Sequence, residues 1–264
     1  MLDHFMTEYE TIVLGIEDDI AVVRLNRPER LNALNVRMRA EICHAVKLAS
    51  DEARVVVLTG EGQAFCSGQD LGDGGSAANL NLEQTLRDEY FPMLQAIYDC
   101  PVPTIAAVNG AAAGAGANLA LTADVVVASD KAYFLQAFTR IGLIPDAGGT
   151  YFMPRMIGSA KAMGAALFAE KITAKQADDW GLIWEAVDSE IFEETWRARA
   201  AHLASGPTKA YASAKEAIRG TWDSTFAAQL RHEAKLQGSC GRSRDFKEGV
   251  LAFTEKRSPS FEGR

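Results

Sequence analysis

Residues 103–128 read PTIAAVNGAAAGAGANLALTADVVVA, and this segment carries the clearest fold signal in the chain. Its length and apolar character resemble a membrane span, but Asn109, Asn118 and Asp124 interrupt it, and Ala and Gly dominate it. Membrane spans require unbroken, strongly apolar runs. We therefore expect a tightly packed core segment. It predicts a strand at 103–109, a short helix of small residues at 114–123 and a second strand at 124–130.

The chain before this segment alternates strands and helices. Runs rich in Val and Ile that are bounded by turn residues predict strands, and apolar residues at helical spacing predict helices. A stretch rich in Gly, Ser and Asp predicts a loop. On these grounds we expect strands at 11–16, 20–26 and 54–60, helices around 38–49 and 82–98, and a loop at 61–80.

The chain after this segment becomes mostly helical. Further strands are expected at 132–136 and 182–187, whereas helical patterns fill most of the sequence after Gly148. Strands that alternate with helices indicate an α/β fold, which we divide into a core at 1–200 and a helical region at 201–264. The apolar stripes on the last helices suit packing on a neighbouring subunit, and an intramolecular bundle would produce the same pattern.

Composition and charge limit the classes of function. The chain has 264 residues, of which 48% are hydrophobic and 23% are charged, and its net charge is -8. This composition is typical of a globular protein, and the negative charge argues against non-specific binding to nucleic acid or to an anionic membrane. The four scattered cysteines form no CxxC or Cys/His cluster, so neither a metal site nor a disulfide framework is predicted. With no signal peptide expected, we predict a cytoplasmic protein.

Three common catalytic arrangements fit the sequence poorly. Ser67 lies in AFCSGQD, where Phe65 replaces the first glycine of a nucleophile elbow. Gly60 and Gly62 follow a strand, but Phe65 stands at the third glycine position of a dinucleotide-binding loop and no helix follows. The four histidines lie in no glycine-rich or strand-end setting. A serine hydrolase and a Rossmann-type enzyme are therefore disfavoured, and no histidine is predicted to be a general base.

Two glycine-rich loops remain as candidates for catalysis. Ser67-Gly68-Gln69 follows a short apolar run, and Gly114-Ala115-Gly116 begins the predicted small-residue helix. Both loops leave backbone N–H groups accessible, and a helix N-terminus favours developing negative charge. Two N–H groups that converge on one oxygen would form an oxyanion hole. Two ordinary tight turns explain the same residues, and the sequence by itself favours that simpler interpretation.

Four motifs occur in a characteristic order: RLNRPERLNALN at 24–35, AFCSGQDL at 64–71, AAVNGAAAGAGANLAL at 106–121 and GLIPDAGGT at 142–150. Together they resemble the enoyl-CoA hydratase/isomerase (crotonase) superfamily, and the similarity covers essentially the whole chain. The resemblance implies a spiral of ββα units with a C-terminal helical oligomerisation region that forms trimers, or hexamers built as dimers of trimers. It also implies an acyl-CoA thioester substrate, with CoA as part of the substrate and no separate cofactor.

The resemblance also assigns roles by motif position. It implies that the N–H groups of Gln69 and Ala115 polarise the thioester carbonyl. Hydratases of the family use two glutamates, and Asn118 and Phe138 stand at those positions here. Neither side chain exchanges a proton, so the usual addition of water is disfavoured. The residues expected to border CoA or the acyl group are Arg30, Leu31, Ala33, Asp70, Leu71, Gly72, Gly114, Asn118 and Phe138.

Asp146 is the acid-base candidate that remains. An acid at this position resembles ring-1,2-epoxyphenylacetyl-CoA isomerases, dienoyl-CoA isomerases and 4-chlorobenzoyl-CoA dehalogenases. Dienoyl isomerases need further acids where Asn118 and Phe138 stand, and the dehalogenases need a histidine where Gln95 stands. The surrounding motifs therefore look closest to the ring-epoxide isomerases of phenylacetate catabolism.

The predicted chemistry is a proton shuttle. Asp146 would remove a proton next to, or vinylogous to, the thioester carbonyl and return it to another carbon. Phe138 and Ile144 are expected to raise its pKa by desolvation, and Tyr90 and Phe91 are candidates to line a ring-shaped pocket. Capping of the following helix is the competing interpretation of Asp146. The alternative functions are a 3,2-trans-enoyl-CoA isomerase, an enoyl-CoA hydratase of fatty acid oxidation and a non-catalytic acyl-CoA binding protein.

Overall fold

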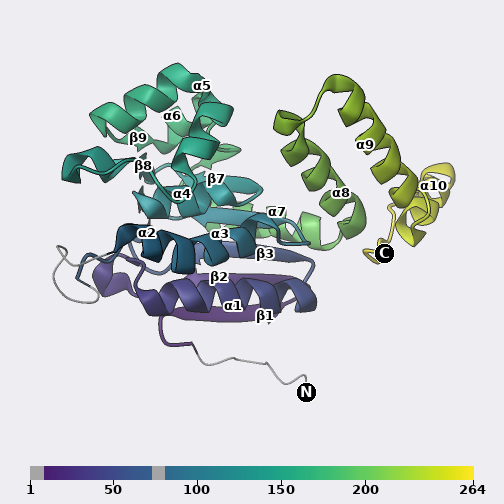
Figure 1. The fold of residues 1–264 in the computed structure, drawn as a ribbon. Coiled ribbons are helices and arrows are strands. Elements are labelled where there is room, and N and C mark those ends of the chain that lie inside the picture. Colours follow the sequence, from purple (N-terminus) through teal and green to yellow (C-terminus); the bar gives the residue numbers. More distant parts are fainter. Residues whose placement is uncertain (1–8, 73–80) are drawn as a thin grey trace.

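Two sheets form the frame of the protein (Figure 1). The structure, a computed structural model, describes residues 9–72 and 81–264. In the first sheet, six strands lie in the order β1-β2-β3-β5-β7-β10, with β1 antiparallel to β2 and the other neighbours parallel. The strand bounds are β1 (Ile12–Glu17), β2 (Ile20–Leu25), β3 (Val55–Gly60), β5 (Thr104–Val108), β7 (Val125–Ser129) and β10 (Glu185–Val187).

The second sheet contains short strands in the order β4-β6-β8-β9, of which β4, β6 and β8 are parallel and β9 is antiparallel. Each parallel strand follows directly on a strand of the first sheet, so the chain passes from β3 to β4, from β5 to β6 and from β7 to β8. Helices return the chain to the first sheet after β4 and β6. This repeat confirms the predicted α/β spiral of ββα units. The bounds are β4 (Ala64–Cys66), β6 (Ala111–Ala113), β8 (Tyr133–Leu135) and β9 (Ile172–Thr173).

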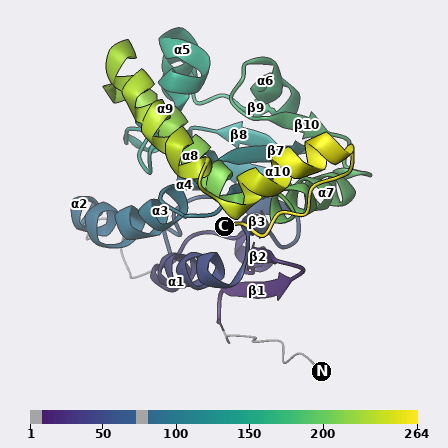
Figure 2. The ribbon, with the colours of Figure 1, turned by 90° about the vertical axis from the view of Figure 1, so that its right-hand side faces the viewer.

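Helices cover both faces of the first sheet (Figures 1 and 2). Val55 and Val57 of β3 pack with Trp196 in one apolar cluster, whereas Val56 and Leu58 belong to the cluster on the other face. Because successive strand residues point to opposite faces, a strand covered on both sides is apolar throughout. The helices of the body are α1 (Val36–Glu52), α2 (Leu82–Thr85), α3 (Phe91–Tyr98), α4 (Ala115–Thr122), α5 (Gly149–Phe168), α6 (Ala174–Asp179) and α7 (Phe192–Ala204).

Three of the short strands differ from the prediction. The prediction of a continuous loop at 61–80 is wrong for β4, and β6 and β9 were not predicted, because runs of two or three residues show no period. The strand predicted at 132–136 is confirmed as β8. Residues 73–80 of that loop, like residues 1–8, lie outside the described residues. The helical stretch predicted at 82–98 is confirmed, but a π-helical turn, η3 (Leu86–Tyr90), separates α2 from α3.

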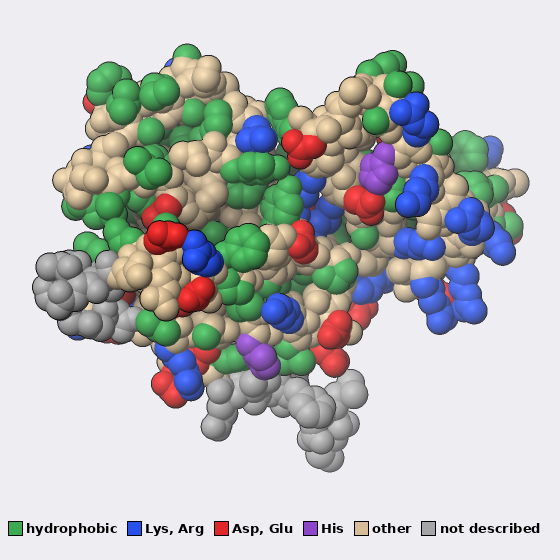
Figure 3. Space-filling view, in the orientation of Figure 1, with side chains coloured by type: hydrophobic (Ala, Val, Ile, Leu, Met, Phe, Trp, Pro, Cys, Tyr) green, Lys and Arg blue, Asp and Glu red, His purple; other side chains and the backbone are tan. Residues whose placement is uncertain are grey.

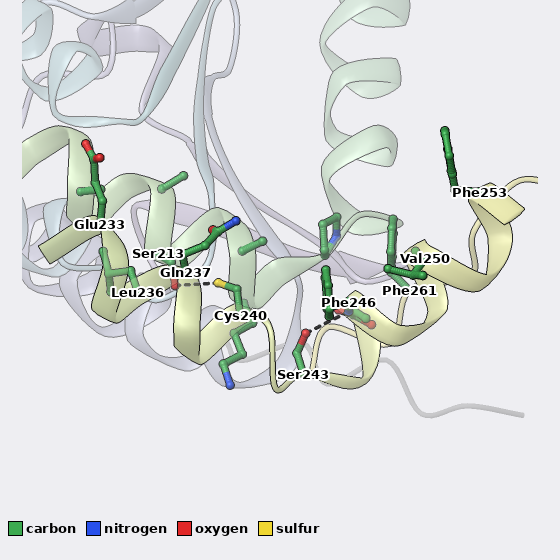
Figure 4. A pocket seen from close by; sticks show the side chains of 17 residues that line it. Ser213, Glu233, Leu236, Gln237, Cys240, Ser243, Phe246, Val250, Phe253 and Phe261 are labelled. Atoms are coloured by element: carbon green, nitrogen blue, oxygen red, sulfur yellow. Dashed lines mark hydrogen bonds between the residues drawn. The ribbon is translucent and has the colours of Figure 1, made fainter. Parts of the chain in front are cut away.

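Three C-terminal helices extend away from the body (Figure 1): α8 (Thr208–Arg219), α9 (Phe226–Cys240) and α10 (Arg244–Glu255). Ion pairs tie α8 to the body, because Lys215 and Arg219 lie 2.7 and 2.8 Å from carboxylate oxygens of Asp124. A cavity of about 400 Å³ lies between α8 and the body, where the surface is hollowed (Figure 3). Another of about 550 Å³ lies among the three helices, lined by side chains such as Phe246 and Phe261 (Figure 4).

Large apolar side chains on these helices face solvent. Ile218, Phe226 and Phe253 are 70%, 80% and 86% exposed. Such surfaces mark interaction sites, which agrees with the subunit contacts expected for this region. The trimer or hexamer and the division at residue 200 stay predictions. Helix α7 still packs on the first sheet, and no helix among the described residues combines the length and apolarity needed to cross a bilayer.

Replacing Trp196 by Ala should lower the free energy of unfolding by about 3–5 kcal/mol, because the fully buried indole would leave a cavity. Trp184 is exposed, so Trp184→Ala is a matched control that should change the free energy of unfolding by less than about 0.5 kcal/mol. Urea unfolding of both variants measures the difference. Equal losses would contradict the placement of α7 in the core.

Candidate functional site

One cavity lies where the parallel strands of the second sheet end. The segments that follow β4, β6 and β8 all contribute to its wall, and its volume is about 280 Å³. Carboxyl ends of parallel strands are a common place for ligand sites, because the loops that follow converge there. The lining residues are Ser67, Gly68, Gln69, Leu71, Leu82, Thr85, Leu86, Tyr90, Gly114, Ala115, Ala137, Phe138, Arg140, Ile141, Leu143 and Asp146.

Glycines let the first two loops approach each other closely. Gly68 has a φ of +100°, and a Cβ atom there would lie 2.8 Å from the carbonyl oxygen of Ala113 and 3.5 Å from the amide nitrogen of Ala115. Gly114 has a φ of +54°, which turns the chain sharply between β6 and α4. L-residues with side chains rarely adopt these backbone conformations. The two glycines therefore bring Gln69 and Ala115 to the same cavity.

The N–H groups of Gln69 and Ala115 are available to a ligand. Within the described part of the chain, neither donates a hydrogen bond. The flanking peptides are fixed, since the Leu34 N–H donates to Gly68 O at 2.8 Å and the Asp70 N–H donates to Leu34 O at 3.1 Å. Ala115 is the first residue of α4, where the helix dipole favours negative charge. This arrangement suits an oxyanion, as the sequence analysis expected.

Asp146 is the carboxylate in the wall of the cavity. Its Oδ1 atom is buried and has no hydrogen-bond partner among the described residues. Burial raises the pKa of Asp146 from 3.8 to about 6, because desolvation disfavours the charged form. The competing interpretation, a helix cap, is wrong: α5 has Gly148 at its N-cap position, and no side chain caps it.

The backbone of Asp146 is held from behind the cavity. Its carbonyl oxygen accepts a hydrogen bond from Asn118 Nδ2 at 2.7 Å and another from the Gly149 N–H at 2.8 Å. Asn118 is fully buried and also donates to and accepts from the side-chain amide of Gln136, at 3.3 and 2.8 Å. Asn118, expected to bind substrate, therefore does not line the cavity; it positions the turn that carries Asp146.

Apolar side chains surround the carboxylate, although not all of those expected. Phe138 is buried and lines the cavity, as do Leu143 and Tyr90. The expectation for Ile144 is wrong, because this side chain is 75% exposed and does not line the cavity. Phe91 is also exposed and lies outside the lining, so of the two aromatic candidates only Tyr90 faces the cavity.

Not all of the residues expected to border CoA line the cavity. Leu71 and Gly114 line it. Arg30, Leu31 and Ala33 do not, but their loop runs beside the cavity wall, since the Ser67 N–H donates to Leu31 O at 3.0 Å. Asp70 and Gly72 also lie outside the lining: Asp70 pairs with Arg27 at 2.9 Å and accepts from the Gly72 N–H at 3.0 Å. The role of all these residues in binding CoA stays a prediction.

Arg39 is a residue of this site that the sequence analysis missed. Its guanidinium is almost fully buried and donates to Gln69 Oε1 at 3.2 Å, behind the cavity wall. The signal in the sequence is an arginine at helical spacing from Ile42 and Val46, within the apolar stripe of α1. A buried arginine needs partners, but the sequence does not identify them.

Comparisons with known proteins identify the family to which this fold belongs. The model of the enoyl-CoA hydratase/isomerase family matches residues 15–264. A Rhodobacter capsulatus protein named "Probable enoyl-CoA hydratase" is 61% identical, over 97% of this chain and 99% of that protein. The 1,2-epoxyphenylacetyl-CoA isomerase of Escherichia coli is 43% identical, again over 97% and 99%. A crystal structure of enoyl-CoA hydratase from Bacillus anthracis superposes with a TM-score of 0.89 at 31% identity, covering 97% of this chain and all of that one.

The buried carboxyl of Asp146 should make stability depend on pH. Its pKa is raised to about 6 in the folded protein, so between about pH 4 and pH 6 the folded state keeps a proton that the unfolded state has released. Its contribution to stability is therefore most favourable at low pH and is lost as the pH rises through about 6. Asp146→Asn, which cannot ionise, should be more stable than the unaltered protein at neutral pH. This difference should shrink toward pH 4, as urea midpoints at several pH values would measure.

Asp70→Asn is the matched control for this measurement. Burial alone would raise the pKa of Asp70, but hydrogen bonds from Arg27 and Gly72 lower it overall. Its stabilising contribution is present above the pKa of the unfolded chain, so Asp70→Asn should destabilise the protein at neutral pH. If Asp146→Asn behaved in the same way, the carboxylate of Asp146 would have a stabilising partner and the site described here would be wrong.

Proposed function

This chain belongs to the enoyl-CoA hydratase/isomerase family, and we propose that it is a CoA-thioester isomerase with Asp146 as its proton shuttle. One observation carries the proposal: Asp146, whose Oδ1 atom is buried and without a hydrogen-bond partner among the described residues, lines the same cavity as Gln69 and Ala115, whose backbone N–H groups donate to no described residue. The N–H groups of Gln69 and Ala115 would bind the thioester oxygen. CoA belongs to the substrate, and the chemistry proposed requires no further cofactor.

The reaction follows from this geometry. Asp146 removes a proton from a carbon next to, or conjugated with, the thioester carbonyl, and the electron pair moves onto the thioester oxygen. The two N–H groups stabilise this enolate, and losing one such donor typically slows a reaction by about 100- to 1,000-fold. Protonated Asp146 then returns the proton to another carbon, so the double bond moves and the atoms balance without water.

The environment of Asp146 supports this role. A pKa of about 6 leaves the carboxylate charged at neutral pH and makes it a stronger base than an exposed aspartate. Phe138 and Leu143 add apolar surface to the wall of the cavity that holds Asp146. For one base to serve two carbons, both carbons must lie within reach of the same oxygen atom. A cavity of about 280 Å³ leaves the acyl group little room to move away from Asp146, which favours this requirement.

The acyl group proposed is the ring-1,2-epoxide of phenylacetate. Its isomerisation to the oxepin thioester breaks the bond between the two epoxide carbons and rearranges the ring double bonds, so that the oxygen becomes part of a seven-membered ring. Asp146 then transfers the proton from the carbon next to the thioester carbonyl to a ring carbon. The support is the identity to the Escherichia coli isomerase, together with a cavity whose wall includes the aromatic rings of Tyr90 and Phe138. The same proton transfer serves a 3,2-enoyl-CoA substrate, and the two activities are compatible in one protein. The proposed assembly is a homotrimer or a dimer of trimers formed through the C-terminal helices.

Hydration is the alternative that the name of the Rhodobacter relative raises. Among the described residues that line the cavity, Asp146 is the only carboxylate. Asn118 and Phe138 stand where the hydratases carry acids, and the Asn118 amide is engaged with Gln136 and the Asp146 carbonyl. A second carboxylate to activate water is therefore absent from the described lining, which favours isomerisation over hydration.

Replacing Asp146 by Asn should abolish isomerisation but not binding. The loss of a positioned general base lowers kcat by about 100- to 10,000-fold, whereas the amide has nearly the same shape as the carboxylate and should leave the Kd for acyl-CoA close to its original value. Steady-state kinetics with 3-hexenoyl-CoA and with the ring-epoxide thioester, and calorimetry with hexanoyl-CoA, measure both quantities. Unchanged turnover would reject Asp146 as the base.

A substrate panel separates the proposed function from hydration. Crotonyl-CoA hydration should be at least about 100-fold slower than isomerisation of 3-hexenoyl-CoA or of the ring-epoxide thioester, because the acid-base pair for water is missing. Comparable hydration would assign the protein to the hydratases. Binding without turnover of any member of the panel would favour a non-catalytic acyl-CoA binding protein.

A further inference from the structure

Tyr90 is the cavity residue whose role the proposed reaction leaves open. Its side chain is buried, lines the cavity and feels the charge of Asp146. A hydroxyl near the base is an obvious candidate for a second acid. The contacts of Tyr90 with Gln69 and Arg39 point to another role.

The orientation of the Gln69 amide is fixed by Arg39. Arginine only donates hydrogen bonds, so the Gln69 atom 3.2 Å from Arg39 Nη1 must be the oxygen Oε1. The Tyr90 hydroxyl lies 2.5 Å from the same oxygen and must therefore donate to it. The proton of Tyr90 is committed to Gln69 and is not available to a substrate. Burial also raises the pKa of Tyr90, which keeps the hydroxyl protonated.

Arg39 is itself held rigidly. Its Nη1 atom also donates to Leu34 O at 2.6 Å, and its Nε and Nη2 atoms donate to Glu89 Oε2 at 3.0 and 2.5 Å. The guanidinium lies 4.8 Å from the centre of the Tyr90 ring. Leu34 is the residue that brackets the Gln69 peptide through its backbone. Arg39 therefore restrains Gln69 in two ways. It bonds directly to the Gln69 side chain, and it bonds to Leu34, whose backbone holds the peptides on either side of Gln69.

Glu89 and Tyr90 are the last two residues of the π-helical turn η3. Both contact the same guanidinium: Glu89 accepts hydrogen bonds from it, and the Tyr90 ring lies beside it. The end of η3 therefore supplies two of the contacts that hold Arg39, and π-turns occur often at functional sites.

From these contacts, we propose that Tyr90 and Arg39 are positioning residues that clamp the Gln69 side chain and so aim the Gln69 N–H at the thioester oxygen. The inference rests on the proposed function, because it concerns the donor of the proposed oxyanion hole. It assigns a role to Arg39 of α1 and to Tyr90 of η3, which the proposed reaction does not use. Neither residue transfers a proton.

The carbonyl stretch of bound [1-¹³C]hexanoyl-CoA tests the clamp directly. This saturated thioester has no double bond to move, so the band reports polarisation of the carbonyl independently of turnover. In the unaltered protein and in Asp146→Asn, binding should shift the band to lower wavenumber. Tyr90→Phe removes the hydroxyl and keeps the ring, and it should show a smaller shift. Tyr98→Phe, which removes a hydroxyl outside the cavity lining, should match the unaltered protein.

Kinetics provide the second measurement. Tyr90→Phe should lower kcat by about 10-fold with little change in KM, less than the 100- to 1,000-fold expected when an oxyanion donor is lost outright. Gln69→Met removes this hydrogen bond together with the one from Arg39, keeps the backbone N–H and should lower kcat at least as much. The double variant should be no worse than Gln69→Met alone, because that change already removes the acceptor of the Tyr90 hydroxyl.

The outcomes separate the two proposals. A smaller band shift and a kcat loss that is not additive would support the clamp. An equal band shift in Tyr90→Phe and the unaltered protein, or additive losses in the double variant, would overturn the clamp and leave the proposed isomerase intact. No band shift in the unaltered protein would overturn the oxyanion site and the clamp together.

Discussion

The close approach of β4, β6 and α4 is the constraint on which the site depends. A Cβ atom at Gly116 would lie 2.2 Å from the carbonyl oxygen of Cys66, so α4 can pack against β4 only because this residue is glycine. The pairing of β4 with β6 and of β6 with β8 then aligns the ends of three strands. The abundance of Ala and Gly at 111–117 follows from this packing. The segments that follow β4, β6 and β8 meet there, and the first two present Gln69 and Ala115 to one cavity.

The carboxylate proposed as the base conflicts with stability, and the structure shows how the fold accommodates it. Oδ1 of Asp146 has no partner among the described residues, which is unfavourable for a buried charged group. The backbone around it is secured by Asn118 and Gln136 instead. Asn118, at a position where the resemblance implies an acid in hydratases, thus supports the turn that carries Asp146.

The sequence predicts the parts of the fold that have a period. Strands such as β3 and β5 are recognisable because both faces are apolar, and α1 because its apolar stripe recurs every three to four residues. In the second sheet β8 was predicted, but β4, β6 and β9 are too short to show a pattern, although the loops after β4 and β6 build the site. Local sequence could not separate a cap from a base at Asp146, since both precede a helix. Arg39 and Gln69 are 30 positions apart, so their contact is visible only in three dimensions.

A crystal structure with a bound acyl-CoA tests the central claim most directly. The account predicts that the thioester oxygen lies about 2.7–3.1 Å from both the Gln69 and Ala115 amide nitrogens, as oxyanion donors require. It also predicts that a carbon next to or conjugated with the carbonyl faces Oδ1 of Asp146. A thioester oxygen bound elsewhere, or an acyl chain that lies on the far side of the cavity from Asp146, would contradict it.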